Sequence, residues 1–125
     1  MLTLFNLLAM VCIIISCRSS VTVTLEVDLF EKTLAQTTNP QLVDVRTLEE
    51  YSGEHLPGSI MIDVRETTFD SLILQLDKNR PVFVYCRSGK RSLDAAGILE
   101  KNNFKEVYNL EGGIIAWKEK DKAVK

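Results

Sequence analysis

The feature that most constrains the fold of this chain is the alternation of short apolar strands with helical segments. The strand-like runs are rich in β-branched and other apolar residues and lie at residues 21–25, 42–45, 59–63, 81–85 and 106–110. The intervening segments with helical patterns lie at residues 28–36, 47–51, 69–76, 92–101 and 114–120. Strands that alternate with helices form βαβ units. The sequence therefore predicts an α/β fold with a mainly parallel sheet covered by helices on both faces.

Chain length allows one folded domain, which we expect over residues 21–120, because 125 residues can bury a single self-sufficient core. The formal net charge is -2 and the isoelectric point is near 5.4. The basic residues form no long stripe along the sequence, so the composition gives no reason to expect nucleic-acid binding.

The first 17 residues are predicted to be an export signal. Leu2–Ile15 is apolar apart from Thr3 and Asn6, and it is shorter than the roughly 20 apolar residues that span a bilayer. The run ends in Ile-Ser-Cys17 and is followed by polar residues, which resembles a bacterial lipobox. This resemblance implies that Cys17 is lipidated and that the protein is exported and tethered to a membrane of the bacterial cell envelope.

One departure leaves alternatives open, because no Lys or Arg precedes the apolar run. Simple secretion into the periplasm and an uncleaved anchor are the other interpretations. Cys12 would leave with the signal, so Cys86 would be the only thiol of the folded domain and no internal disulfide is expected. A Cys17–Cys86 bridge would consume that thiol and is the less favoured arrangement.

The segment Tyr85–Ser92 is the strongest indication of chemistry. It follows a buried strand and contains Gly and Ser residues before the next helix, so Cys86 is placed where backbone N–H groups and a helix N-terminus converge. Such a point stabilises a thiolate and attracts an oxyanion. Arg87, Lys90 and Arg91 add positive charge beside it. The segment therefore predicts a cysteine nucleophile that acts on a small anion.

Residues Val21 to Lys118 resemble the single-domain rhodanese family of sulfurtransferases. The resemblance depends on four motifs in order: Leu42–Arg46 with Glu50 and Tyr51, Glu54–Ile60, Cys86–Ser92 and Leu110–Trp117. It implies a five-stranded parallel sheet, a persulfide on Cys86 and ping-pong sulfur transfer from a donor such as thiosulfate to cyanide or to a small or protein thiol. It also implies a cradle made by the residues that follow the cysteine: Arg87, Ser88, Gly89, Lys90 and Arg91.

Within that cradle, the resemblance gives Arg91 the task of holding the anion, while Arg87 and Lys90 steer it. Ser88 and Ser92 are candidate hydrogen-bond donors. No cofactor or metal is expected, and we expect a monomer.

Two other functions remain open. Phosphatases and arsenate reductases related to rhodaneses place five residues between Cys and Arg, whereas four separate Cys86 from Arg91. The shorter loop fits a sulfur atom better than a phosphoryl group. A non-catalytic binding module of the same fold is the other alternative, and the retained cysteine argues against it.

Several other polar residues are interpreted as structural. His55 lies in the turn before Pro57, and Asp44 and Arg46 flank a strand end, where an acid and a base more often hold loops together than react. Trp117 and Tyr108 are expected to pack in or beside the core. Gly112 and Gly113 are expected to allow a tight turn into the last helix.

Overall fold

The computed structural model of the chain describes residues 21–125. The predicted signal, with Cys12 and the proposed lipid site Cys17, lies outside the described residues. Within residues 21–125, no helix is both long and apolar enough to cross a membrane.

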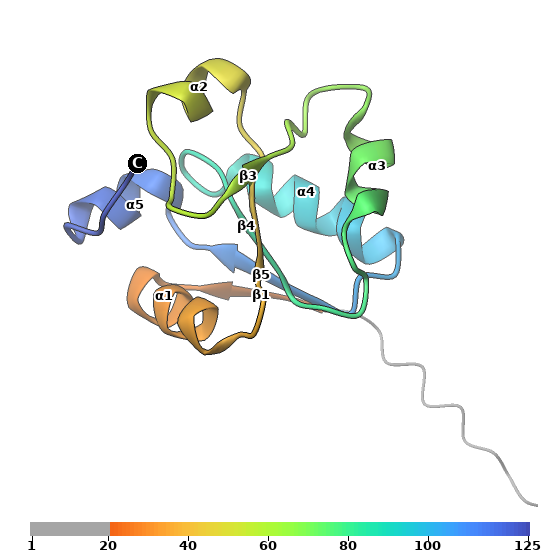
Figure 1. The fold of residues 1–125 in the computed structure, drawn as a ribbon, viewed down its shortest axis with the longest axis horizontal. Coiled ribbons are helices and arrows are strands. Elements are labelled where there is room, and N and C mark those ends of the chain that lie inside the picture. The colour runs from red at the N-terminus through yellow and green to blue at the C-terminus, as the bar shows by residue number, and fades with distance from the viewer. Residues whose placement is uncertain (1–20) are drawn as a thin grey trace, which may run out of the picture.

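A five-stranded sheet forms the centre of the domain, and every pairing in it is parallel, as the strand–helix alternation predicts (Figure 1). The spatial order is β1-β5-β4-β2-β3. The strands are β1 (Val21–Leu25), β2 (Gln41–Asp44), β3 (Ile60–Met61), β4 (Val82–Tyr85) and β5 (Glu106–Leu110). Strand β4 lies in the middle of the sheet, between β5 and β2, so the chain that leaves it starts from the centre of the carboxyl edge.

Helices cover both faces of this sheet (Figure 1). On one face lie α1 (Val27–Gln36) and α5 (Gly113–Glu119), and on the other lie α3 (Phe69–Leu72), the 3-10 turn η1 (Ile73–Gln75) and α4 (Lys90–Lys101). The short helix α2 (Leu48–Gly53) follows β2 at the carboxyl edge. It begins with a capping box in which the Thr47 hydroxyl accepts from the Glu50 N–H and the Glu50 carboxylate accepts from the Thr47 N–H.

Alternation along β4 divides the apolar interior into two layers. Val82, Val84 and Cys86 belong to the core under α3 and α4, whereas Phe83 and Tyr85 belong to the core under α1 and α5. All five of these residues are buried. The period-two pattern therefore places the thiol on the same side of the sheet as α4, the helix whose N-terminus follows it.

The structure corrects some predicted boundaries. The strand predicted at Ser59–Asp63 is reduced to Ile60–Met61 because both of its ends form turns. The Ser59 N–H donates to the Leu56 carbonyl, and the Asp63 carboxylate accepts from the Arg65 N–H.

Two predicted helices also differ. The helix predicted at residues 69–76 ends as an α-helix at Leu72 and continues as the tighter turn η1, in which the Leu76 N–H donates to the Ile73 carbonyl. The helix predicted from Ser92 begins at Lys90, because Gly89 adopts a left-handed conformation just before it.

The apolar layer under α4 gives a test of how the helix is anchored. Leu99 is 1% exposed in this layer, whereas Leu93 on the same helix is 51% exposed. We expect Leu99→Ala to lower the free energy of unfolding by about 3 kcal/mol, and Leu93→Ala by less than about 1 kcal/mol, measured by urea denaturation. Equal losses would contradict the assignment of α4 to this core.

Candidate active site

Cys86 directly follows the central strand β4 and precedes α4, the longest helix within residues 21–125. Its side chain is only 1% exposed. The loop from Cys86 to Gly89 turns sharply into α4, and Gly89 has a φ of 107°, a conformation that residues with a Cβ rarely adopt. This turn returns the chain toward the cysteine, so the first amides of α4 lie close to the thiol.

Hydrogen bonds converge on the sulfur atom. The Gly89 N–H donates to Cys86 Sγ at 3.0 Å, and the Ser92 hydroxyl lies 3.4 Å from Sγ. The same hydroxyl also lies 3.0 Å from the Gly89 carbonyl oxygen, so its single proton can be donated to either acceptor.

These donors determine the ionisation of the thiol. Burial raises the pKa of Cys86, but hydrogen bonds from the Ser92 side chain and from the backbone N–H groups of Ser92, Gly89 and Ser88 outweigh it, so the pKa is lowered. Cys86 is thus a buried cysteine whose environment favours the thiolate.

The N-terminus of α5 holds the other side of the same loop. The Ile114 N–H donates to the Cys86 carbonyl at 2.9 Å, and the Ile115 N–H donates to the Arg87 carbonyl at 3.2 Å. Because each carbonyl points toward α5, these two bonds fix the orientation of the peptides that begin the cradle. A Cβ on Gly113 would overlap these carbonyl groups, and Gly113 also has a φ of 59°. The predicted tight turn at Gly112–Gly113 is confirmed, and it has this further role in supporting the loop.

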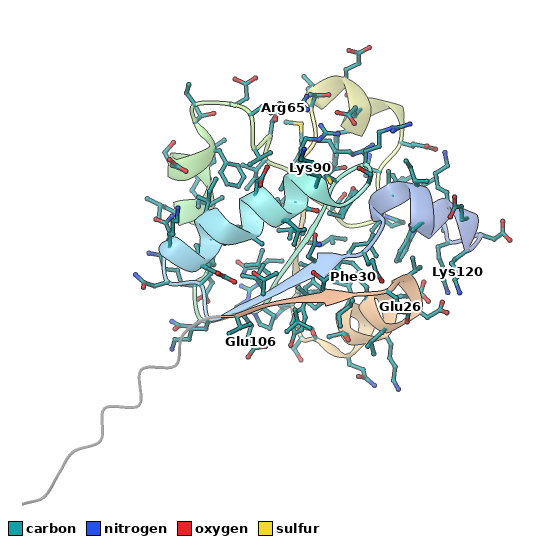
Figure 2. The ribbon with its side chains drawn as sticks, turned by 180° about the vertical axis from the view of Figure 1, so that it is seen from behind. Glu26, Phe30, Arg65, Lys90, Glu106 and Lys120 are labelled. Atoms are coloured by element: carbon teal, nitrogen blue, oxygen red, sulfur yellow. The ribbon has the colours of Figure 1, made fainter. Side chains whose placement is uncertain are left out.

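The three cations of the Cys86–Arg91 segment have different environments. Arg87 and Lys90 are exposed. Figure 2 shows Lys90 at the start of α4, at one end of the domain, and Glu106 at the start of β5, at the other end. Arg91 is largely buried and forms a bidentate ion pair, in which Nη1 and Nη2 donate to the two carboxylate oxygens of Glu50 at 2.7 and 2.9 Å. The guanidinium that was expected to hold an anion therefore binds a carboxylate of α2.

This ion pair perturbs both of its members. The hydrogen bond from Arg91 is the main cause that lowers the pKa of Glu50 to about 2. The Glu50 hydrogen bond raises the pKa of Arg91, and the charge of Cys86 contributes in the same direction. Arg91 is therefore within electrostatic reach of the thiolate although its hydrogen bonds go to Glu50.

A hollow of about 560 Å³ opens beside the cysteine loop, between α2 and α5. Its walls contain both charges and apolar surface: Arg46, Glu49, Glu50, Gly53, Glu54, Arg87, Ile114, Ile115 and Lys118. Arg87, the residue after the cysteine, and Ile114 and Ile115, whose amides hold the loop, are all part of it. The hollow is thus built on the same elements that position Cys86.

A buried polar network supports this edge of the sheet. Arg46 donates to both carboxylate oxygens of Asp44 and to the Glu54 carbonyl, at distances between 2.7 and 3.1 Å. The Tyr85 hydroxyl accepts from the Leu56 N–H at 3.0 Å and lies 3.0 Å from the Ser59 hydroxyl. The predicted structural role of Asp44 and Arg46 agrees with these contacts, since each side chain is used to hold the loops after β2 and α2.

His55, Trp117 and Tyr108 make packing and hydrogen-bonding contacts. The His55 ring stacks on Tyr51 with its Nδ1 2.9 Å from the Tyr51 carbonyl oxygen. Trp117 is buried and donates its indole N–H to the Ala123 carbonyl, and Tyr108 stacks on Phe83.

Residues 26–120 match the family described as the rhodanese-like domain. The chain belongs to this family. The match covers the five-stranded sheet from β2 onward, the cysteine loop and α5.

Named relatives agree with this assignment. A protein named sulfurtransferase from Allochromatium vinosum is 37% identical over 84 residues, which cover 67% of this chain and 77% of that protein. The thiosulfate sulfurtransferase GlpE of Pseudomonas savastanoi is 32% identical over 77 residues, covering 62% of this chain and 71% of GlpE. The crystal structure of a rhodanese-like domain protein from Staphylococcus aureus superimposes with a TM-score of 0.67 at 30% identity, over 75% of this chain and 89% of that one.

Two parts of this rhodanese-like site were not identified from the sequence. The pairing of Glu50 with Arg91 spans 41 positions, and the Thr47–Glu50 pattern indicates a helix cap without indicating a partner on another helix. The α5 amides that bind the loop carbonyls are backbone groups. The only sequence signal for them was the Gly112–Gly113 pair.

Because α5 supports the cysteine loop through Gly113, adding a single methyl group at this residue is expected to lower the stability of the protein strongly. Gly113→Ala is expected to destabilise the protein by at least about 2 kcal/mol and to slow alkylation of Cys86, because the loop peptides must move. Gly97→Ala is the matched control, since Gly97 lies within α4 with nothing within 4 Å of an added Cβ. It should be neutral or stabilising by up to about 1 kcal/mol. A Gly113→Ala variant with unchanged stability and alkylation rate would contradict this role of α5.

The hydroxyl of Ser92 predicts a pH effect. Since its hydrogen bond lowers the pKa of Cys86, Ser92→Ala should raise that pKa and move the pH profile of iodoacetamide alkylation to higher pH. Ser88→Ala is the control, because Ser88 acts on the thiol through its backbone N–H, which the substitution retains. A Ser92→Ala profile that coincides with the wild-type profile would show that the hydroxyl does not stabilise the thiolate.

Proposed function

We propose that the protein is a sulfurtransferase that carries a sulfane sulfur as a persulfide on Cys86. The observation that carries this proposal is the convergence of the Gly89 N–H and the Ser92 hydroxyl on a buried sulfur atom whose pKa is lowered. A set of donors aimed at one sulfur stabilises an anion there, whether the anion is the thiolate or the terminal sulfur of a persulfide. The relatives named as sulfurtransferases support the same activity.

In the first half-reaction, the Cys86 thiolate attacks the outer sulfur of a donor. With thiosulfate, a new S–S bond forms to Cys86 and the bond between the two thiosulfate sulfurs breaks. The electron pair of the broken bond leaves with sulfite. The terminal sulfur keeps the negative charge that it carried in thiosulfate, and the charge of the thiolate is balanced by the second charge of sulfite. The loop donors therefore face one anionic sulfur in the free enzyme and in the persulfide.

In the second half-reaction, an acceptor nucleophile attacks the terminal sulfur. Cyanide or a thiolate forms a bond to that sulfur, the S–S bond to Cys86 breaks, and Cys86 is released as the thiolate. Because the enzyme is modified between the two halves, the kinetics should be of the ping-pong type. The exposed Arg87 lies at the hollow through which a donor or acceptor would approach.

Two features disfavour the alternative functions. The loop places four residues between Cys86 and Arg91, and the Arg91 guanidinium is paired with Glu50, so it does not complete a cradle for a tetrahedral phosphate or arsenate. A binding module would have no need for hydrogen bonds that lower the pKa of a buried thiol.

The central test is an assay of sulfur transfer from thiosulfate to cyanide, in which the rate of thiocyanate formation is measured. We expect ping-pong kinetics for the wild type and loss of at least about 1000-fold in kcat/KM for Cys86→Ser, because the nucleophile is removed. Cys12→Ser makes the same exchange outside the described domain and should retain activity. Thiocyanate formation by Cys86→Ser at the wild-type rate would sink the proposal.

A further inference from the structure

Most charged side chains around the hollow are neutralised by ion pairs. Arg46 binds Asp44, Lys118 binds Glu54 and Arg91 binds Glu50. Of the other charged side chains in the wall, Arg87 is a cation and Glu49 is an anion. The wall of the hollow therefore provides little net positive charge for a dianion such as thiosulfate.

Glu50 is the member of these pairs that bears most directly on the thiol. It binds Arg91, a largely buried cation in the first turn of α4, and that cation is within electrostatic reach of Cys86. Glu50 also lines the hollow, and its position is fixed by the Thr47 hydroxyl, which donates to Oε1 at 3.1 Å. A dianionic donor that approaches Cys86 must therefore compete with a well-held carboxylate for the Arg91 guanidinium.

The size and lining of the hollow point to a larger donor. The hollow is open to solvent and has a volume of about 560 Å³, so it has room for a donor larger than a five-atom anion. Ile114 and Ile115 provide apolar wall, while Arg87 and Glu49 provide one charge of each sign. These groups match an organic substituent that carries both polar and apolar parts.

We propose that Glu50 is a specificity-determining residue that turns this site away from dianionic donors and toward organic persulfides with at most one net negative charge. The inference rests on the sulfur-transfer function proposed above and names the class of donor. Glu50 acts through Arg91: by occupying both terminal nitrogens of the guanidinium, it withholds from a dianion a cation that lies within electrostatic reach of the thiol.

The step with such a donor is balanced without any further reactant. The Cys86 thiolate attacks the terminal sulfur of R–S–SH, a Cys86 S–S bond forms and the S–S bond of the donor breaks. The electron pair of that bond leaves on R–S⁻, and the proton stays on the transferred sulfur. One negative charge enters the step and one leaves it.

The test compares the rates at which two donors load sulfur onto Cys86 of the full chain. The gain of sulfur is measured over time by intact-protein and peptide mass spectrometry. The donors are thiosulfate and the persulfide of 2-mercaptoethanol, and the quantity compared is the ratio of the thiosulfate rate constant to the alkyl persulfide rate constant. We expect the wild type to load faster from the alkyl persulfide. Glu50→Gln removes the charge while a Gln at this position preserves the capping box, and we expect it to raise the ratio about tenfold, the effect of one nearby charge.

Three further variants make the test specific to the pair. Arg91→Gln leaves the Glu50 charge uncompensated and should lower the ratio, and the double variant Glu50→Gln/Arg91→Gln should return it to near the wild-type value. Glu31→Gln is the matched control, because it removes a carboxylate that is paired with Lys122 on the α1 side of the domain and takes no part in the hollow. It should leave the ratio unchanged.

The outcomes separate this inference from the proposed function. An unchanged or lower ratio for Glu50→Gln, an equal rise for Glu31→Gln, or faster loading of the wild type from thiosulfate would overturn the role of Glu50 while sulfur transfer stands. If Glu50→Gln does not fold, Arg91→Gln provides the test. An unchanged or higher ratio of the two rate constants in Arg91→Gln would also overturn the role of Glu50. Absence of sulfur on Cys86 with both donors would instead overturn the sulfur-transfer proposal itself.

Discussion

The two hydrogen bonds from the N-terminus of α5 to the cysteine loop are the contact on which the site depends. The Ile114 and Ile115 amides hold the carbonyls of Cys86 and Arg87, and this orientation leaves the following amides free to face the sulfur. The close approach requires Gly113, where a Cβ would overlap those carbonyls. The last helix of the domain, 27 positions beyond the cysteine (113 − 86), therefore fixes the geometry in which the thiolate is stabilised.

The electrostatics of this site come mainly from neutral donors. The Gly89 N–H and the Ser92 hydroxyl contact the sulfur, while the largely buried cation Arg91 is bound to Glu50. Neutral donors stabilise one negative charge wherever it lies on a short sulfur chain, and they do not attract a second charge as strongly as a free guanidinium would. This arrangement suits a carrier whose sulfur chain on Cys86 holds at most one negative charge.

The sequence was sufficient for the architecture and for the position of Cys86, because both depend on local patterns. Strand–helix alternation predicted the parallel sheet, and a cysteine between an apolar strand and a helix with Gly in the loop predicted where the thiol lies. It was not sufficient for contacts between distant segments. The partner of Arg91 lies on α2 and the support of the loop lies on α5, and no periodicity relates these positions to the cysteine. The start of α4 also differs: the helix begins two residues before the predicted Ser92, because its first turn depends on the left-handed conformation of Gly89.

The most direct test of this account is a high-resolution crystal structure of the full chain after exposure to a sulfane donor. The account predicts one additional sulfur atom bonded to Cys86 Sγ, with that terminal atom within hydrogen-bond distance of the loop amides and with the Ile114 and Ile115 bonds to the loop carbonyls intact. A Cys86 that carries no sulfur, or a terminal sulfur directed away from these amides, would contradict the claim that the loop is built to hold a persulfide.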